Sequence, residues 1–131
     1  MHASEMAIRG YKNTQKSMGS DTELELKIFT SITGRLAGAD VAKPGGISTL
    51  NQAVTDNAKL WNLLFLDITN PGNALDDGLK SSLIYLAEFT RQHTHKVLNG
   101  DAGHQILIEI NNNVIAGKRA FLANTPEIEA A

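Results

Sequence analysis

Apolar residues recur at steps of three and four along most of this chain, and this helical period constrains the fold more than any other feature. The period is strong in four segments, 20–38, 48–69, 75–98 and 102–122, and weak over 1–19. Turn-forming residues separate the segments, most clearly Lys43-Pro44-Gly45-Gly46 and Asn70-Pro71-Gly72-Asn73. The pattern predicts an all-α fold, a small helical bundle of four to five helices.

Capping residues predict where the helices begin and end. Ser20 and Glu23 form the pattern of a capping box at the start of the second segment, and Ser48 is the expected N-cap of the third. The fourth segment stops at Asn99-Gly100, a common C-terminal signal. Because 75–98 is apolar over most of its circumference, we expect that helix to lie at the centre of the bundle.

The size and composition of the chain predict one soluble domain. Hydrophobic residues make up 42% of the 131 residues and charged residues 20%, which is typical of a globular chain. We expect a single domain over 1–131 with a frayed tail at 124–131. The sequence has no cysteine, no signal-peptide core and no apolar run of membrane-spanning length, which predicts a cytoplasmic protein with no membrane partner.

No residue pattern predicts catalysis. No serine is set beside a plausible base, and Gly45-Gly46 lacks the Lys-Ser or Lys-Thr pair of a phosphate-binding loop. His93 and His95 are two residues apart, so on a helix they point to different sides and do not chelate one metal ion. His93 is instead predicted to be a core histidine with one hydrogen bond. The sequence therefore predicts a non-enzymatic protein with no cofactor and no metal site.

Two predicted helices carry more apolar surface than a small bundle needs. Segment 102–122 has one apolar stripe that contains Ile106 and Phe121, and a second stripe on roughly the opposite side. In 48–69, two leucines fall outside the apolar arc. These surplus residues are either covered by neighbouring helices, or form a homodimer contact, or bind the amphipathic helix of a partner. The candidate partner-binding residues are Ile108, Asn111, Ile115, Leu122, Leu63 and Leu66.

Two asparagines lie among these apolar residues. Asn57 sits in the apolar arc of 48–69 between Val54 and Trp61, and Asn111 belongs to the second stripe of 102–122. A buried amide is costly unless it is hydrogen-bonded, so we expect each asparagine to cap a loop or to fix the register of the helices. Trp61 itself is a predicted core residue.

The second half of the chain carries an ordered set of motifs. They are Asn57-x-x-Leu60-Trp61, Gly72-Asn73-x-Leu75, Arg91-x-His93-Thr94 and Ile108-x-Ile110-Asn111, followed by Ile115 and Gly117. The set, which spans Asn57 to Phe121, resembles the FlaF family, small regulators of flagellar biosynthesis in alphaproteobacteria. The chain departs from the family at Asp76, Phe89 and Lys118, where proline, tryptophan and leucine are frequent.

The resemblance implies a cytoplasmic, non-enzymatic positive regulator of flagellin synthesis or secretion in bacterial flagellum biogenesis and motility. It implies flagellin as the protein partner, held by an adaptor or export chaperone, and a second regulator that restrains flagellin translation as a companion. The terminal segments of flagellin are helical in the filament and largely unfolded before assembly. Spare apolar stripes on a helical bundle suit such segments.

An alternative role is post-transcriptional. Arg9, Lys12 and Lys16 form a basic strip around Tyr11, and such a strip suits contact with flagellin mRNA. The net charge of −2 gives no bulk support to RNA binding. The companion translational regulator is the other partner that this alternative allows.

Overall fold

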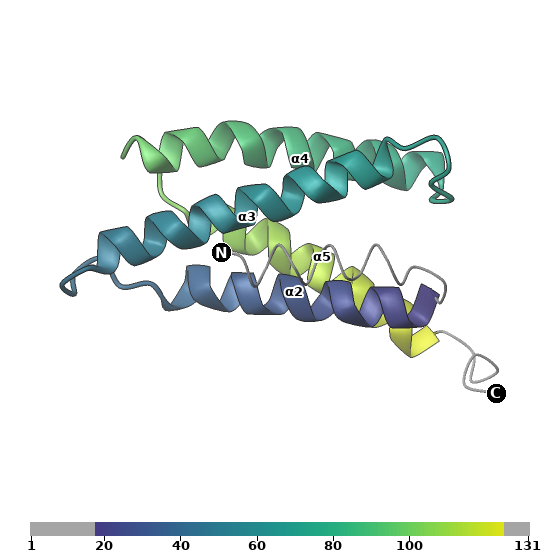
Figure 1. Ribbon diagram of the computed structural model, residues 1–131, viewed down its shortest axis with the longest axis horizontal. Coiled ribbons are helices and arrows are strands. Elements are labelled where there is room, and N and C mark those ends of the chain that lie inside the picture. The colour runs from purple at the N-terminus through teal and green to yellow at the C-terminus, as the bar shows by residue number, and fades with distance from the viewer. Residues whose placement is uncertain (1–17, 125–131) are drawn as a thin grey trace.

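The protein is an all-α bundle, as the sequence predicts. The computed structural model describes residues 18–124, and these form the helices α2 (Met18–Gly38), α3 (Gly46–Ile68), α4 (Asp77–Leu98) and α5 (Gln105–Asn124), shown in Figure 1. The predicted weak helix over 1–19 and the predicted tail at 124–131 lie almost wholly outside the described residues. No helix among residues 18–124 has the length and apolar character needed to cross a membrane.

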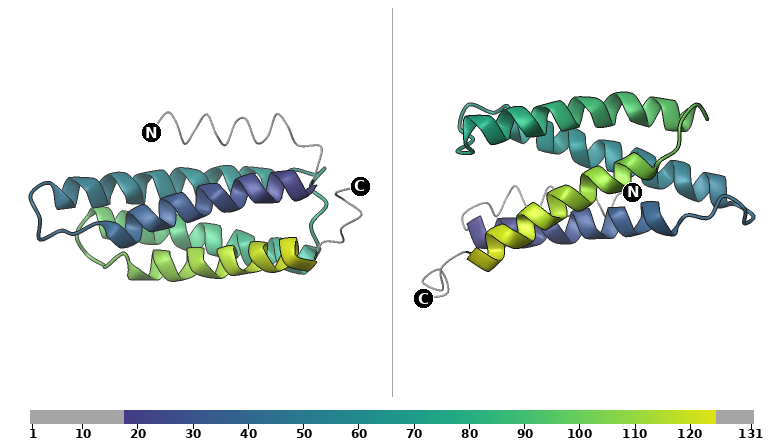
Figure 2. Two further views of the ribbon diagram at one scale, coloured as in Figure 1. Left: turned by 90° about the horizontal axis from the view of Figure 1, so that it is seen from below. Right: turned by 180° about the vertical axis from the view of Figure 1, so that it is seen from behind.

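The helix α3 lies at the centre of the bundle, between α2 and α4 (Figure 1). The helix α2 packs on α5 and α3, whereas α4 packs mainly on α3. The helix α5 starts beside the end of α4 and runs away from it toward α2 (Figure 2). The prediction that 75–98 is the central helix is therefore wrong. Because α5 diverges from α4, much of the wide apolar arc of α4 is covered from one side only.

The loop before α3 shifts the start of that helix away from the predicted cap. Gly45 is the N-cap, with a left-handed φ of 76°, and its carbonyl accepts the first helical hydrogen bond from Thr49 N at 3.0 Å. A Cβ at Gly46 would collide with the Asp40 backbone. The helix thus begins at a glycine that the tight loop requires, and the prediction of a cap at Ser48 is wrong. Ser20 likewise lies inside α2 rather than at its start.

The start of α4 is capped by a carboxylate. The side chain of Asp76 accepts a hydrogen bond from Leu79 N at 3.2 Å, and Asp77 adds a second negative charge to the first turn. Both carboxylates stabilise the N-terminus of the helix, because the backbone N–H groups there have no partner within the helix. Asp76→Ala is expected to lower the free energy of unfolding by about 1 kcal/mol in urea denaturation. Asp77→Ala should cost only about 0.5 kcal/mol, and equal losses would contradict the capping role.

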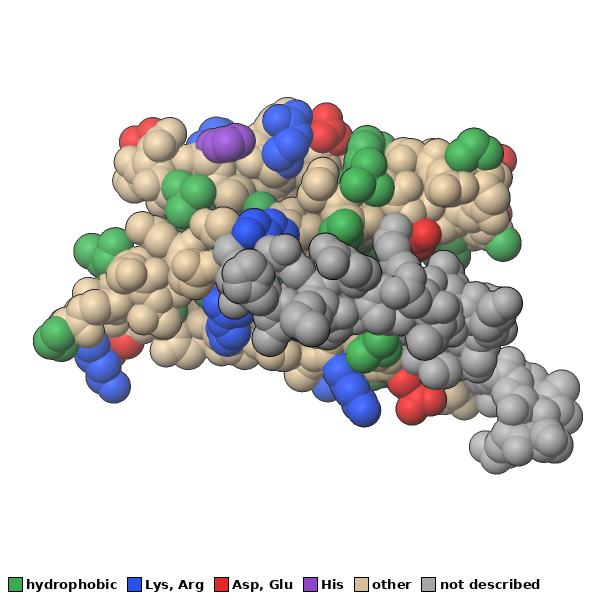
Figure 3. All heavy atoms as spheres, in the orientation of Figure 1, with side chains coloured by type: hydrophobic (Ala, Val, Ile, Leu, Met, Phe, Trp, Pro, Cys, Tyr) green, Lys and Arg blue, Asp and Glu red, His purple; other side chains and the backbone are tan. Residues whose placement is uncertain are grey.

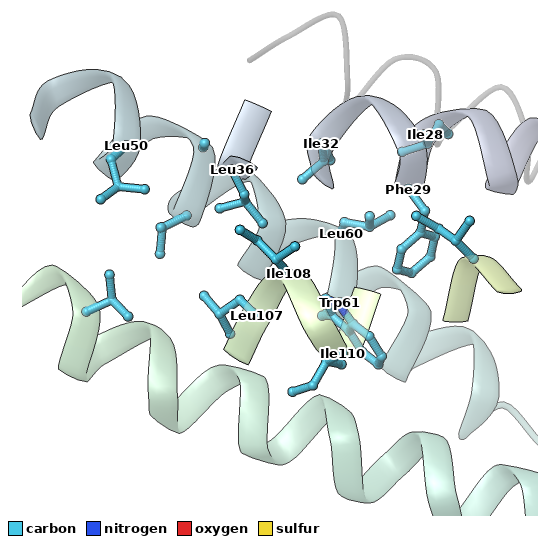
Figure 4. Packing of buried hydrophobic residues seen from close by; sticks show 14 of the residues in the cluster. Ile28, Phe29, Ile32, Leu36, Leu50, Leu60, Trp61, Leu107, Ile108 and Ile110 are labelled. Atoms are coloured by element: carbon cyan, nitrogen blue, oxygen red, sulfur yellow. The ribbon is translucent and has the colours of Figure 1, made fainter. Parts of the chain in front are cut away.

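The core lies where α2, α3 and α5 meet (Figure 4). Trp61 is 1% exposed, and its ring meets the ring of Phe29 edge to face at a centroid distance of 5.7 Å. Aliphatic side chains surround this pair and come from all three helices. Trp61 is confirmed as a core residue. The aliphatic residues labelled in Figure 4 are Ile28, Ile32, Leu36, Leu50, Leu60, Leu107, Ile108 and Ile110.

Two ion pairs tie α2 to its neighbours. Arg35 Nη2 lies 2.8 Å from the buried Asp56 Oδ2 of α3. Lys118 of α5 pairs with Glu25, and its Nζ lies 5.5 Å from the centroid of the Phe29 ring. Burial lowers the pKa of Lys118 to about 8. The cation of Lys118 therefore stands beside an aromatic ring of the core.

Candidate functional site

The predicted partner stripe of α5 faces inward. Ile108 and Ile115 are buried, and Asn111 is fully enclosed with 0% exposure. Because α5 packs along α2, this side of the helix is covered, and the expectation that these three residues form an exposed surface is wrong. Leu122, on the same stripe, is half-buried. A neighbouring helix, α2, covers this stripe, which is the first of the alternatives that the sequence left open.

The other stripe of α5 is the less covered one. Ile110 is buried, but Ile106 and Val114 are only half-buried and Phe121 is exposed. Ile106 and Val114 pack against the edge of the core. Sequence periodicity identified two stripes and assigned the wrong one to the surface.

The two asparagines form a buried polar cluster with Trp61. Trp61 Nε1 donates to Asn111 Oδ1 at 2.9 Å, and Asn111 Nδ2 donates to Asn57 Oδ1 at 2.8 Å and to Thr33 Oγ1 at 3.0 Å. The cluster joins α2, α3 and α5 at one level. Asn57 Nδ2 has no hydrogen-bond partner among the described residues. Because these bonds cross between helices, the amides hold the register of the three helices and cap no loop.

The two leucines predicted on α3 have different environments. Leu63 is half-buried and packs against the core, whereas Leu66 is 53% exposed. Leu66 follows Thr55, Lys59 and Asn62 at steps of four, three and four, so these residues lie on one face of α3. Leu66 thus remains a surface candidate, and it lies in line with the groove described next.

A groove runs between α3 and α4 and has a volume of about 450 Å³. Apolar atoms make up most of its lining. It lies along the contact of the two antiparallel helices, and we call it the α3–α4 groove. Its lining residues are Thr55, Ala58, Lys59, Trp61, Asn62, Phe65, Ala87, Glu88, Arg91, Thr94, His95 and Leu98.

The rim of the α3–α4 groove is charged. Arg91 Nε lies 3.1 Å from Glu88 Oε1, and this hydrogen bond lowers the pKa of the Glu88 carboxyl. Lys59 stands on the α3 wall and His95 on the α4 wall. Figure 3 shows basic and histidine side chains over the C-terminal half of α4, with apolar side chains toward its N-terminal half. The groove therefore combines an apolar floor with a rim in which cations outnumber carboxylates.

The α3–α4 groove was not predicted, although two alanines in the sequence are a sign of it. Ala58 and Ala87 lie at similar separations on either side of the turn at Asn70-Pro71-Gly72-Asn73. Antiparallel helices joined at that turn bring the two positions to a similar level. Two small side chains facing each other leave a hollow between helices, whereas larger ones would fill it.

The remaining histidine prediction is confirmed in part. His93 Nε2 lies 2.8 Å from Gly103 O, and its ring stacks on Phe89 at 5.4 Å. The single hydrogen bond is as predicted, but the residue is half-buried at the α4–α5 loop rather than in the core. Among residues 18–124, no three His, Asp or Glu side chains cluster as metal ligands would. The basic strip around Tyr11 lies outside the described residues.

Comparison with protein families shows the family to which the chain belongs. The family model described as flagellar protein FlaF matches residues 7–117, which is most of the 131-residue chain. Comparison with curated proteins finds no match, and comparison with solved structures finds none either. The family match confirms the resemblance that the motifs between Asn57 and Gly117 indicated.

Proposed function

Because the chain belongs to the FlaF family of flagellar proteins, we propose that it binds flagellin as an adaptor or export chaperone. By holding flagellin before assembly, it promotes flagellin synthesis or secretion during flagellum biogenesis in the cytoplasm. The single observation that carries the proposal, beyond family membership, is the α3–α4 groove, an apolar trough on a small helical bundle. Grooves of this kind accept amphipathic helices.

The exposed apolar residues near the groove support the same role. Leu98 lines the groove and is 39% exposed, and Leu66, which is 53% exposed, lies on the face of α3 that carries Thr55, Lys59 and Asn62. Exposed apolar side chains that continue an apolar groove enlarge the surface that a protein partner can cover. Unassembled flagellin, with unfolded segments that become helical, is a partner that needs such cover.

Calorimetric titration with monomeric flagellin from the same organism tests the proposal. We expect saturable binding near one-to-one with a dissociation constant of about 1 µM or tighter. Assembled filaments serve as the control, because their terminal helices are already packed, and they should not bind. Absence of heat at about 50 µM monomer would contradict the proposal. Binding of flagellin mRNA instead, with steep salt dependence, would favour the post-transcriptional alternative.

A further inference from the structure

We infer that residues 4–17 form an amphipathic helix that docks on α2 and α3 of the same chain, against a surface that we call the α2–α3 face. The α2–α3 face consists of Leu24, Ser31 and Arg35 of α2 and of Asp56, Leu63 and Leu66 of α3. The inference goes beyond the proposed function, because it concerns the bundle itself and needs no flagellin. The geometry of the face, the place where the segment joins the bundle and the pattern of the segment each support it.

One hydrogen bond fixes which sides of α2 and α3 meet. Arg35 Nη2 donates to Asp56 Oδ2 at 2.8 Å. Leu24 lies on the same side of α2 as Arg35, because the eleven residues between these positions make about three helical turns. Leu63 lies on the same side of α3 as Asp56, seven residues and about two turns further on, and Leu66 lies next to it. The α2–α3 face is therefore one continuous surface.

The α2–α3 face is only partly covered by the helices that the structure describes. Leu24 and Leu63 are half-buried at the edge of the core, and Leu66 is 53% exposed. Beside them on α2, Ser31 and Gly34 are exposed, and a Cβ added at Gly34 would meet nothing within 4 Å. Apolar side chains next to small ones form a surface that another helix can approach closely.

The attachment point of the segment lies at one end of this face. Residues 1–17 precede the described part of the chain and join it where α2 begins, at Met18. The start of α2 lies at the same end of the bundle as the end of α3, which carries Leu63 and Leu66 (Figure 1). A helix that turns back at this point runs antiparallel to α2 and follows the α2–α3 face.

The lengths of the helices bring the apolar residues of the segment level with those of the face. Ile8 stands ten residues before Met18 and Ile28 ten residues after it, so a segment that turns back brings Ile8 level with Ile28. Ile28 is in turn level with Leu63, because each lies seven residues from its partner in the Arg35–Asp56 pair. Ile8 therefore comes to lie beside Leu63.

The pattern of the segment gives it one apolar side. On a helix, Ala7, Ile8 and Tyr11 share one side, and the basic strip of Arg9, Lys12 and Lys16 lies on the opposite side. A helix of this length that contains Gly10 is marginal by itself, so packing against a neighbour is what stabilises it. The FlaF family model begins at residue 7, so this apolar side belongs to the family domain.

Charge favours the same orientation. Arg35 belongs to the α2–α3 face, and the exposed Lys27 lies beside it. Docking through the apolar side keeps the basic strip on the outside and away from these cations. It also packs Tyr11 against the bundle, where the ring is not available to stack on an RNA base. The inference therefore argues against the role that the mRNA alternative gives to Tyr11.

Disulfide trapping in the full-length protein tests the docked position. The chain has no cysteine, so two introduced cysteines report on one contact only. The test pair is Ala7→Cys with Leu63→Cys, and the control pair is Ala7→Cys with Leu86→Cys, another half-buried leucine at the edge of the core, on α4. We expect the test pair to form an intramolecular disulfide at least about tenfold faster than the control pair, because only docking holds its cysteines within bonding distance.

Two further substitutions, each made in the test pair, ask whether the apolar side holds the segment in place. Ile8→Glu puts a carboxylate on the docked side, and Asn13→Glu makes the same change of net charge away from it. We expect Ile8→Glu to slow disulfide formation at least about tenfold, because the charge resists burial, and Asn13→Glu to change the rate less than about twofold.

Three outcomes would overturn the inference. They are equal rates for the test and control pairs, equal effects of Ile8→Glu and Asn13→Glu, and a test pair that yields only cross-linked dimers, which would place the segment on a second copy. Mass spectrometry distinguishes dimers from cross-linked monomers, and circular dichroism under reducing conditions checks that each variant is folded. Since no flagellin enters the experiment, its failure leaves the proposed function standing, and failure of flagellin binding leaves the docked segment standing.

Discussion

Ile108→Glu is expected to unfold the bundle. The side chain is 8% exposed and lies in the core where α5 packs on α2. A glutamate there would be either an unpaired buried charge or a neutral acid without hydrogen-bond partners. The expected loss is about 5 kcal/mol or more, which is comparable with the whole stability of a domain of this size. Loss of the helical circular dichroism signal and of a cooperative thermal transition measures it.

Ile47→Glu provides the matched control. Ile47 is 62% exposed in the first turn of α3, so the same substitution there should change the free energy of unfolding by less than about 0.5 kcal/mol. If Ile108→Glu instead keeps its helices and its cooperative melt, Ile108 lies on the surface. The stripe with Asn111 and Ile115 would then return as a partner surface, as the sequence alone indicated.

Trp61→Ala is expected to lower the free energy of unfolding by about 3–5 kcal/mol. The substitution opens a cavity beside Phe29 and removes the edge-to-face ring contact. It also leaves Asn111 Oδ1 without the indole donor at 2.9 Å, so a buried polar atom loses its partner. Urea denaturation followed by far-ultraviolet circular dichroism measures the loss without relying on the indole itself.

Two further variants divide the effect of Trp61→Ala into its parts. Trp61→Phe retains an aromatic ring but removes the donor, and it should cost about 1–3 kcal/mol. Tyr85→Ala removes an aromatic ring that is 69% exposed and should cost less than about 0.5 kcal/mol. A loss for Trp61→Ala no greater than that for Tyr85→Ala would show that the indole is not part of the core.

The helices were predictable because their periods are long and their breaks are strong. Pro44 with its two glycines, and the turn at Asn70-Pro71-Gly72-Asn73, interrupt any helix, and the structure places loops at both. Helix starts were less predictable. The cap at Ser48 failed because the loop that returns from α2 closes on Gly45, and loop closure is a tertiary constraint that local capping preference does not contain.

The binding surface was harder to predict because an apolar stripe in the sequence does not show whether a neighbouring helix covers it. Ile108 and Phe121 both belong to apolar stripes of α5, but Ile108 is buried and Phe121 is 40% exposed. Which stripe is buried depends on the direction in which α5 runs away from α4. The spacing of apolar residues along the sequence does not determine that direction. The groove depends on two alanines from different helices, so it becomes visible only when α3 and α4 are paired.

The buried asparagines were recognisable as polar residues in an apolar arc, yet their partners were not. Asn57 and Asn111 are far apart in sequence, and their hydrogen bond exists only because α3 and α5 cross at that level. The same crossing lets Asn111 hold the indole of Trp61, whose ring forms part of the groove floor. The core and the proposed binding surface therefore share one side chain.

That shared side chain provides the most direct test of flagellin binding in the α3–α4 groove. Trp61 is the only tryptophan in the chain, so its indole N–H gives a single, assignable nuclear magnetic resonance signal. On titration with monomeric flagellin, we expect this signal and the backbone amides of Ala58, Ala87 and Arg91 to shift together. Shifts confined to α2 or to the half-buried stripe of α5, with the indole signal unmoved, would contradict the account.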